Sequence, residues 1–232
     1  MKFSKAVMVC LLLAWLTACG PVRRVAEPPP DEGPALPAGA QRFDIDPAAS
    51  QLRILVYRAG ALASLGHNHV ISSSGLSGYV AVAPALADSV FVLTLPVASL
   101  EVDRPELRAE EGEDFPGPLD AEAIAGTRSN MLGERLLNAA MFPEIRLQSR
   151  SVSGRLPELT IAAELRVKDR LSEITVPVSV DLQGETLTAS GRFTLAQSAL
   201  GLEPFSVMLG ALAVRDELDL RFTIVARRKI ND

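Results

Sequence analysis

Four segments in the second half of the chain alternate between apolar and polar side chains with a period of two residues. They cover residues 159–167, 174–182, 187–195 and 218–224. This period is expected of a strand that packs one face inward and exposes the other face to water. Short turn signals between them, Lys168-Asp169-Arg170 and Gln183-Gly184, indicate hairpins. The sequence therefore predicts an antiparallel meander.

Four earlier segments, 51–58, 76–83, 89–95 and 144–152, bring the number of expected strands to about eight. A sheet of this size with one apolar face removes its exposed edges by closing on itself or by folding into a sandwich. Before the last of these segments, residues 119–138 contain good helix formers and an apolar set at helical spacing, which is Ile124, Met131, Leu132 and Leu136. We expect an all-β fold with one covering α-helix.

The amino terminus has the features of an export signal. Lys2 and Lys5 precede an apolar run over residues 6–16 that is too short to cross a bilayer as a stable helix. The run ends in Leu16-Thr17-Ala18-Cys19-Gly20, which matches the lipobox of bacterial lipoproteins. The sequence therefore predicts a signal peptide over residues 1–18 and lipidation of Cys19. Cys10 would be removed with the signal, so no disulfide is expected in the mature chain.

Residues 19–41 are rich in proline and carry little that is bulky, which is typical of a tether. Loss of Lys2 and Lys5 leaves 21 basic and 28 acidic residues, so the formal charge moves from −5 to −7. This balance argues against nucleic acid as a partner and against electrostatic adhesion to anionic lipids. Membrane attachment is expected through the acyl chains alone. Gly20 after the cysteine favours the outer membrane, facing the periplasm, under the sorting rule of this lipoprotein class.

Several short strings within residues 42–230, the expected globular domain, occur in a characteristic order. They are Phe43-Asp44-Ile45-Asp46 with Ser50, Phe142-Pro143-Glu144-Ile145 with Ser149, Leu165-Arg166-Val167 before Val176-Pro177-Val178, and Gly201 late in the chain. In this order the domain resembles the YceI-like family of exported proteins. The resemblance implies an extended antiparallel, lipocalin-like β-barrel of about eight strands, whose apolar interior holds a long isoprenoid or other amphiphilic lipid.

The chain departs from the family in two places. Where relatives tend to have Arg-Ser-Asp-Phe-Gly, this chain has Gln197-Ser198-Ala199-Leu200-Gly201, so a role of that arginine and aspartate does not transfer. The string Gly66-His67-Asn68-His69 looks like a subgroup variation.

Candidate ligand-binding residues lie at the rim or along the interior of the expected barrel. At the rim we place His67, Asn68 and His69. Aromatic and flexible apolar side chains are candidates for the tunnel lining, since such groups adapt to a lipid. They are Tyr57, Tyr79, Phe91, Phe193, Leu202, Phe205 and Met208.

His67 and His69 also permit a metal site, because a spacing of two puts both on one side of an extended backbone. No second Cys/His cluster completes the ligand set, although the acidic residues Glu110, Glu111, Glu113 and Asp114 could. The alternative is that both imidazoles bond backbone carbonyls at the rim. The acidic stretch over residues 101–114, which contains these four carboxylates, is expected to be a solvated loop.

Taken together, the sequence predicts a protein without enzymatic activity, because no recognisable catalytic triad accompanies the histidines. The expected function is binding, sequestration or transport of a long isoprenoid or other amphiphilic lipid in the cell envelope. No cofactor is expected apart from such a bound lipid, and a homodimer is left open. The alternatives are a metal-binding envelope protein and a structural or assembly factor whose barrel is filled by its own side chains.

Overall fold

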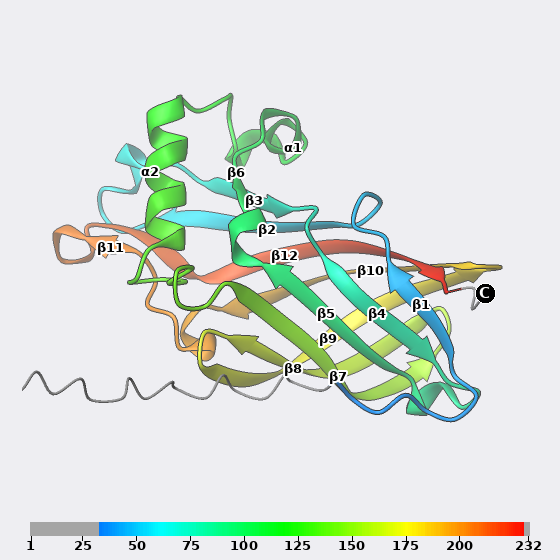
Figure 1. The fold of residues 1–232 in the computed structure, drawn as a ribbon. Helices are drawn as coiled ribbons and strands as arrows, with labels where there is room; N and C mark the ends of the chain where they lie inside the picture. Colours follow the sequence, from blue (N-terminus) through cyan, green and yellow to red (C-terminus); the bar gives the residue numbers. More distant parts are fainter. Residues whose placement is uncertain (1–32, 230–232) are drawn as a thin grey trace, which may run out of the picture. The chain divides into compact units, whose positions relative to one another are not determined.

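Eight antiparallel strands close into a barrel in the computed structural model, which describes residues 33–229 (Figure 1). In spatial order around the ring they are β1 (Gln41–Ile45), β4 (Ser77–Val82), β5 (Val90–Pro96), β7 (Glu144–Arg155), β8 (Glu158–Val167), β9 (Arg170–Gln183), β10 (Thr186–Ala196) and β12 (Leu212–Arg228). The predicted all-β, lipocalin-like barrel is confirmed. The expected signal peptide, Cys19 and the first part of the tether lie outside the described residues.

Four further strands and two helices complete the architecture. The strands are β2 (Gln51–Ala59), β3 (His69–Ser73), β6 (Glu101–Val102) and β11 (Ser206–Val207), and the helices are α1 (Pro105–Ala109) and α2 (Ala121–Leu132). Single turns of 3-10 helix occur at Ala63–Leu65, Leu86–Asp88, Val97–Ser99, Gly112–Asp114, Ser198–Leu200 and Met208–Gly210. No helix among residues 33–229 combines the length and apolar character needed to cross a membrane.

The meander from β7 to β10 forms by successive hairpins, as the alternation predicts. Each strand pairs antiparallel with the next, for example Leu159 of β8 with Val178 of β9. The expected inward residues of β8 are partly or fully buried, and Ala163 is completely inaccessible. On β9 the residues predicted to face inward are buried or partly buried as far as Val180. Leu182, near the end of the strand, is 40% exposed.

Strand β12 changes partner along its length. Its last residues, 226–228, pair with β1, and residues 213–223 pair with β2, which continues into β3 and β6. The ring therefore closes through β1 near the carboxyl end of β12. Towards the other end of β12 the wall is extended by β2, β3 and β6, beneath α2 (Figure 1).

Ser50 completes the backbone hydrogen bonding where β12 changes partner. Val225 lies between the two paired segments of β12, and its N–H donates to Ser50 Oγ at 3.0 Å. Ser50 Oγ in turn donates to the Asp46 carbonyl at 2.8 Å, and the Asp46 N–H donates to the Val225 carbonyl at 2.8 Å. Because Ser50 is 3% exposed, water cannot replace these bonds. These bonds give a structural reason for the serine that follows the Phe-Asp-Ile-Asp string.

The covering helix is shorter than expected. It spans Ala121–Leu132, and the Asp120 side chain caps it by accepting from the Ala123 N–H at 2.7 Å. The expected range 119–138 also includes the irregular turns that follow Gly133. Residues 33–40, assigned to the tether, lead into β1, and the Tyr79 hydroxyl donates to the Pro34 carbonyl at 3.4 Å.

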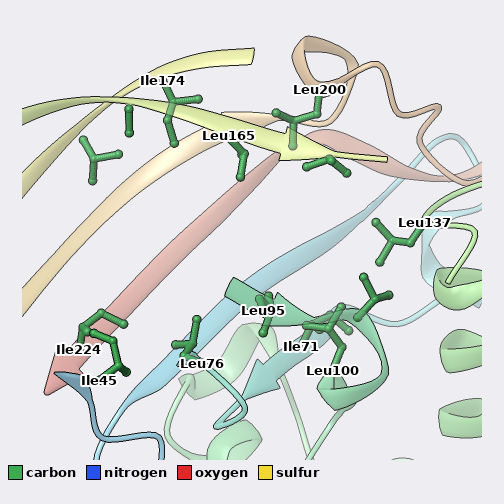
Figure 2. Packing of buried hydrophobic residues seen from close by; sticks show 14 of the residues in the cluster. Ile45, Ile71, Leu76, Leu95, Leu100, Leu137, Leu165, Ile174, Leu200 and Ile224 are labelled. Atoms are coloured by element: carbon green, nitrogen blue, oxygen red, sulfur yellow. The ribbon is translucent and has the colours of Figure 1, made fainter. Parts of the chain in front are cut away.

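The apolar core lines the inside of the barrel. Figure 2 shows side chains from opposite walls, among them Leu165 and Ile174 on one side and Leu76 and Leu95 on the other, directed towards the space between them. That space is a cavity of about 630 Å³, and its lining includes the inward residues of β4, β5, β7–β10 and β12 together with those of β2 and β3. The inward aliphatic groups therefore leave a tunnel.

Ser50→Ala should lower the free energy of unfolding by about 1–3 kcal/mol, because it leaves the partly buried Val225 N–H without its acceptor. Urea denaturation of the domain measures the change. Ser151→Ala, at an exposed position of β7, is the matched control and should have no measurable effect. Equal stability of both variants would contradict the role assigned to Ser50.

Candidate functional site: an apolar tunnel with a polar opening

The tunnel wall is almost entirely aliphatic or aromatic, and its lining has only a few polar side chains. These are Arg58, His67, His69, Ser89, Thr127, Asn130 and Gln197. Three of them are engaged in fixed bonds to the backbone: Arg58 donates to the Gly66 carbonyl, Ser89 accepts from the Ala83 N–H, and Gln197 donates to the Arg215 carbonyl. The remaining polar groups lie on the segment 67–69 and on α2.

Helix α2 turns a face of small and polar residues to the tunnel. Ala123, Gly126, Thr127 and Asn130 follow the spacing i, i+3, i+4 and i+7, and all four line the cavity with Met131. Apart from its chain neighbours and the backbone of α2 itself, no atom lies within 4 Å of the position that a Cβ of Gly126 would occupy. The expected apolar set of the helix, by contrast, contributes the partly buried Ile124 and Leu132 to the core. The helix thus leaves room at the opening of the tunnel.

His69 is held by a buried carboxylate. Its Nδ1 lies 2.6 Å from Asp103 Oδ2, and its side chain is 13% exposed. Its Nε2 lies 3.4 Å from Thr127 Oγ1 of α2, across the opening. The rings of His67 and His69 meet edge to face with centroids 6.2 Å apart, and His67 is the more exposed of the two.

Both carboxylate oxygens of Asp103 are engaged in hydrogen bonds. Oδ1 accepts from the Val70 N–H and from the Arg108 guanidinium, each at 2.8 Å, and Oδ2 faces His69. Burial by itself would raise the pKa of Asp103, but the hydrogen bonds from His69 and Val70 and the nearby positive charge of Arg108 together lower it. The group therefore remains a carboxylate at neutral pH.

Arg108 is 2% exposed and makes three hydrogen bonds in the same region. Besides Asp103 it donates to the Gly117 carbonyl at 2.8 Å and to the Asn68 carbonyl at 2.6 Å. Its guanidinium also lies over the ring of Phe115, 5.7 Å from the centroid. This arrangement ties the strand that carries His69 to the segment outside it.

The prediction that residues 101–114 form a solvated loop is wrong. This segment, with Phe115, forms an outer layer over β2 and β3, where Leu107 and Phe115 pack against Leu55 and Val70. Glu111 lies in the same layer and binds Arg53 at 3.1 Å and Arg221 at 2.6 Å. The acidic composition of the segment suggested that it is exposed to solvent. However, β2 carries apolar residues on both faces, so its outward face must also be covered.

The predicted ligand-binding residues fall into two groups. Those that line the tunnel are His67, His69, Phe91, Phe193, Leu202 and Phe205. The structure places Tyr57, Asn68, Tyr79 and Met208 outside that lining.

Each of these four side chains has another environment. Tyr57 packs against Phe115 in the outer layer, with the two rings tilted. Asn68 accepts from the Arg58 N–H and donates to the Asp114 carbonyl. Tyr79 packs under the Arg42 guanidinium on the outside of the barrel. Met208 is 67% exposed at the tip of the β11–β12 hairpin. Alternation explains the two tyrosines, because Tyr57 lies on the face of β2 opposite Ile54 and Val56.

The metal hypothesis gains no further ligand. Within residues 33–229 no group of three or more His, Cys, Asp and Glu side chains is arranged to hold a metal ion. His69 Nδ1 is already engaged by Asp103, and Glu111 binds two arginines in the outer layer. Two imidazoles alone fall short of the three or four protein ligands usual for zinc.

Comparison with known proteins agrees with this architecture. The YceI-like domain family matches residues 43–226. The chain belongs to the YceI-like family. No curated protein matches the chain. Among solved structures, Burkholderia cenocepacia BcnA is similar in fold, with a TM-score of 0.59, 20% identity, and coverage of 79% of this chain and 99% of BcnA. A Campylobacter jejuni YceI protein gives a TM-score of 0.45 and 11% identity, over 67% of this chain and 82% of that protein.

Arg108→Met should lower the free energy of unfolding by about 3–5 kcal/mol, because it leaves Asp103 as a buried carboxylate without its cation. Arg104→Met is the matched control, since Arg104 pairs with Glu101 and Glu106 at the surface. Urea denaturation of both variants compares them. A loss of stability no larger for Arg108→Met than for Arg104→Met would contradict the role given to the buried pair.

The lowered pKa of Asp103 predicts an acid-dependent loss of stability. A carboxyl whose pKa is depressed on folding contributes stability above its ordinary value of 3.8, and this contribution disappears as the pH falls through the lower folded-state pKa. The wild type should therefore lose more unfolding free energy in this acid range than Asp103→Asn, which does not titrate there. If the unfolding free energy of the two proteins changes with pH in the same way, the Asp103 carboxylate is not the source of the acid-dependent loss of stability.

Proposed function

We propose that this YceI-like protein binds a long isoprenoid or another amphiphilic lipid, with the apolar tail inside the barrel and the polar head group at the opening by His67 and His69. The observation that carries the proposal is the cavity of about 630 Å³ with an almost wholly apolar lining. Transfer of a tail from water into such a lining is favourable by about 25 cal/mol per Å² of apolar surface buried, or about 0.8 kcal/mol per methylene. A cavity of this size also argues against a barrel filled by its own side chains.

The distribution of polar groups supports one orientation of the bound molecule. Arg58 is the one charged side chain in the lining apart from the histidines, and its guanidinium donates to the Gly66 carbonyl beside His67. His67, His69, Thr127 and Asn130 all belong to the segment and the helix that form the opening. A head group is therefore best solvated there, while the tail lies among the aliphatic residues.

The proposal is for binding without a chemical reaction, followed by sequestration or transfer of the lipid. YceI-like barrels are binding proteins, and the polar groups at the opening suit recognition of a head group. The lipobox at Cys19 supports a location in the cell envelope, with acyl chains that hold the domain at the outer membrane on its periplasmic side. Such an anchor would limit diffusion and keep the barrel near a source of lipid.

The domain that begins at Gly33 is suited to a direct test, because residues from Gly33 onward form one compact unit with its own core. Gentle purification, native mass spectrometry and solvent extraction should recover a bound lipid of defined mass. The absence of any extractable lipid, together with failure to bind added long-chain isoprenoid alcohols, would refute the proposal.

Ala163→Phe should weaken lipid binding by about tenfold or more, because the ring would occupy the tunnel that the tail requires. Ala162→Phe is the matched control, since Ala162 is the neighbouring residue on β8 and is not part of the tunnel lining. Equilibrium binding of a tritiated isoprenoid alcohol compares the variants, and circular dichroism checks that both are folded. Equal weakening by the two substitutions would count against the tunnel as the site.

A further inference from the structure

The His69–Asp103 pair has a feature that tail binding does not require. Asp103 is fully buried and lies under the opening of the tunnel, where it fixes one nitrogen of the imidazole. The other nitrogen, Nε2, belongs to a side chain that lines the cavity. Binding of an apolar tail does not by itself require a buried carboxylate at this point, and desolvation of the carboxylate costs free energy.

The bonds of Asp103 determine which nitrogen of His69 carries the proton. Val70 N–H and Arg108 donate to Oδ1, and the arginine already balances the negative charge. An ionised carboxylate only accepts, so the 2.6 Å contact with Oδ2 places a proton on His69 Nδ1. In the neutral imidazole that carries its proton on Nδ1, Nε2 is a hydrogen-bond acceptor with a fixed direction.

The partner of Nε2 within the protein is a weak one. Thr127 Oγ1 lies 3.4 Å away, which is longer than an ordinary hydrogen bond to a hydroxyl. Gly126, the neighbouring residue on α2, leaves space beside it. A bound molecule can therefore reach Nε2 without breaking a strong bond, and the Thr127 hydroxyl can join the contact.

We propose that His69 Nε2 and Thr127 form a head-group subsite for a hydroxyl, so that the protein prefers long isoprenoid alcohols or phenols, whose O–H donates to Nε2, over molecules with the same tail and no such donor. This inference rests on the proposed binding of a lipid in the tunnel and adds the chemical class of its head group. Asp103 and Arg108 act as positioning residues, because they hold the imidazole from behind and do not line the cavity.

An anionic head group matches this subsite less well than a hydroxyl. Asp103 and Arg108 neutralise one another, so the pair offers no net positive potential to a phosphate or carboxylate. Nε2 as an acceptor would face the acceptor oxygens of such a group. Ethers and esters also lack the required donor. Of the simple head groups, a hydroxyl therefore matches the subsite best.

The test compares geranylgeraniol with its methyl ether, which carries the same tail without the O–H. Equilibrium dialysis with the tritiated compounds gives both dissociation constants for the domain that begins at Gly33. The wild type should bind the alcohol about two- to tenfold more tightly, as expected for one neutral hydrogen bond. His69→Leu should bind both compounds equally, and His69→Gln, which keeps a polar group near the place of Nε2, should recover part of the preference.

The outcomes separate this inference from the proposed function. Thr175→Val, at an exposed position of β9, serves as the control and should keep the preference for the alcohol. Equal affinity of the wild type for alcohol and ether, or a preference that survives in His69→Leu, would overturn the hydroxyl subsite and leave lipid binding in place. If the folded wild type binds neither compound, lipid binding in the tunnel is refuted together with the subsite.

Discussion

The whole arrangement depends on one long strand that serves two neighbours. Strand β12 closes the ring through β1 near its carboxyl end, and its longer part pairs with β2. Closure through β1 removes the free edges of the eight-stranded ring, while the β2–β3–β6 extension creates the place where α2 and the outer layer meet. The exchange of partners leaves a gap in the backbone hydrogen bonding at Val225, and the Ser50 hydroxyl fills it. The Ser50 hydroxyl thus stabilises the point at which β12 changes partner.

The opening of the tunnel joins two layers that have different physical characters. Inside, contacts are apolar and the lining leaves space. Outside β2 and β3, the segment that contains Asp103, Arg108 and Phe115 is densely packed and hydrogen-bonded. His69 lies where the layers meet, with one nitrogen directed to each. The outer layer therefore fixes the orientation of the His69 ring, and the ring faces the tunnel. This arrangement is expected of a preorganised recognition group.

The strands could be predicted from the sequence because alternation is a local property. The inward series from Leu159 to Val167 is found as expected, and so are the hairpins of the meander. Strand β1 and the pairing of β3 with β6 were not foreseen, since both are short and their partners lie far away in the chain. The histidine motif was recognised, but its partner Asp103 was not, because the acidic stretch looked like solvent-exposed sequence. A charged residue next to apolar neighbours such as Leu107 and Phe115 was the available signal for a buried contact.

The aliphatic lining described above has a consequence for selectivity. Contacts of this type have no preferred direction, so they respond to bulk and length and hardly at all to the placement of branches or double bonds. Lipid tails that differ in these details can therefore bind in the same tunnel. Discrimination would rest with a handful of side chains at the entrance, and a change of one of them could redirect the same barrel to another cargo without rebuilding its walls.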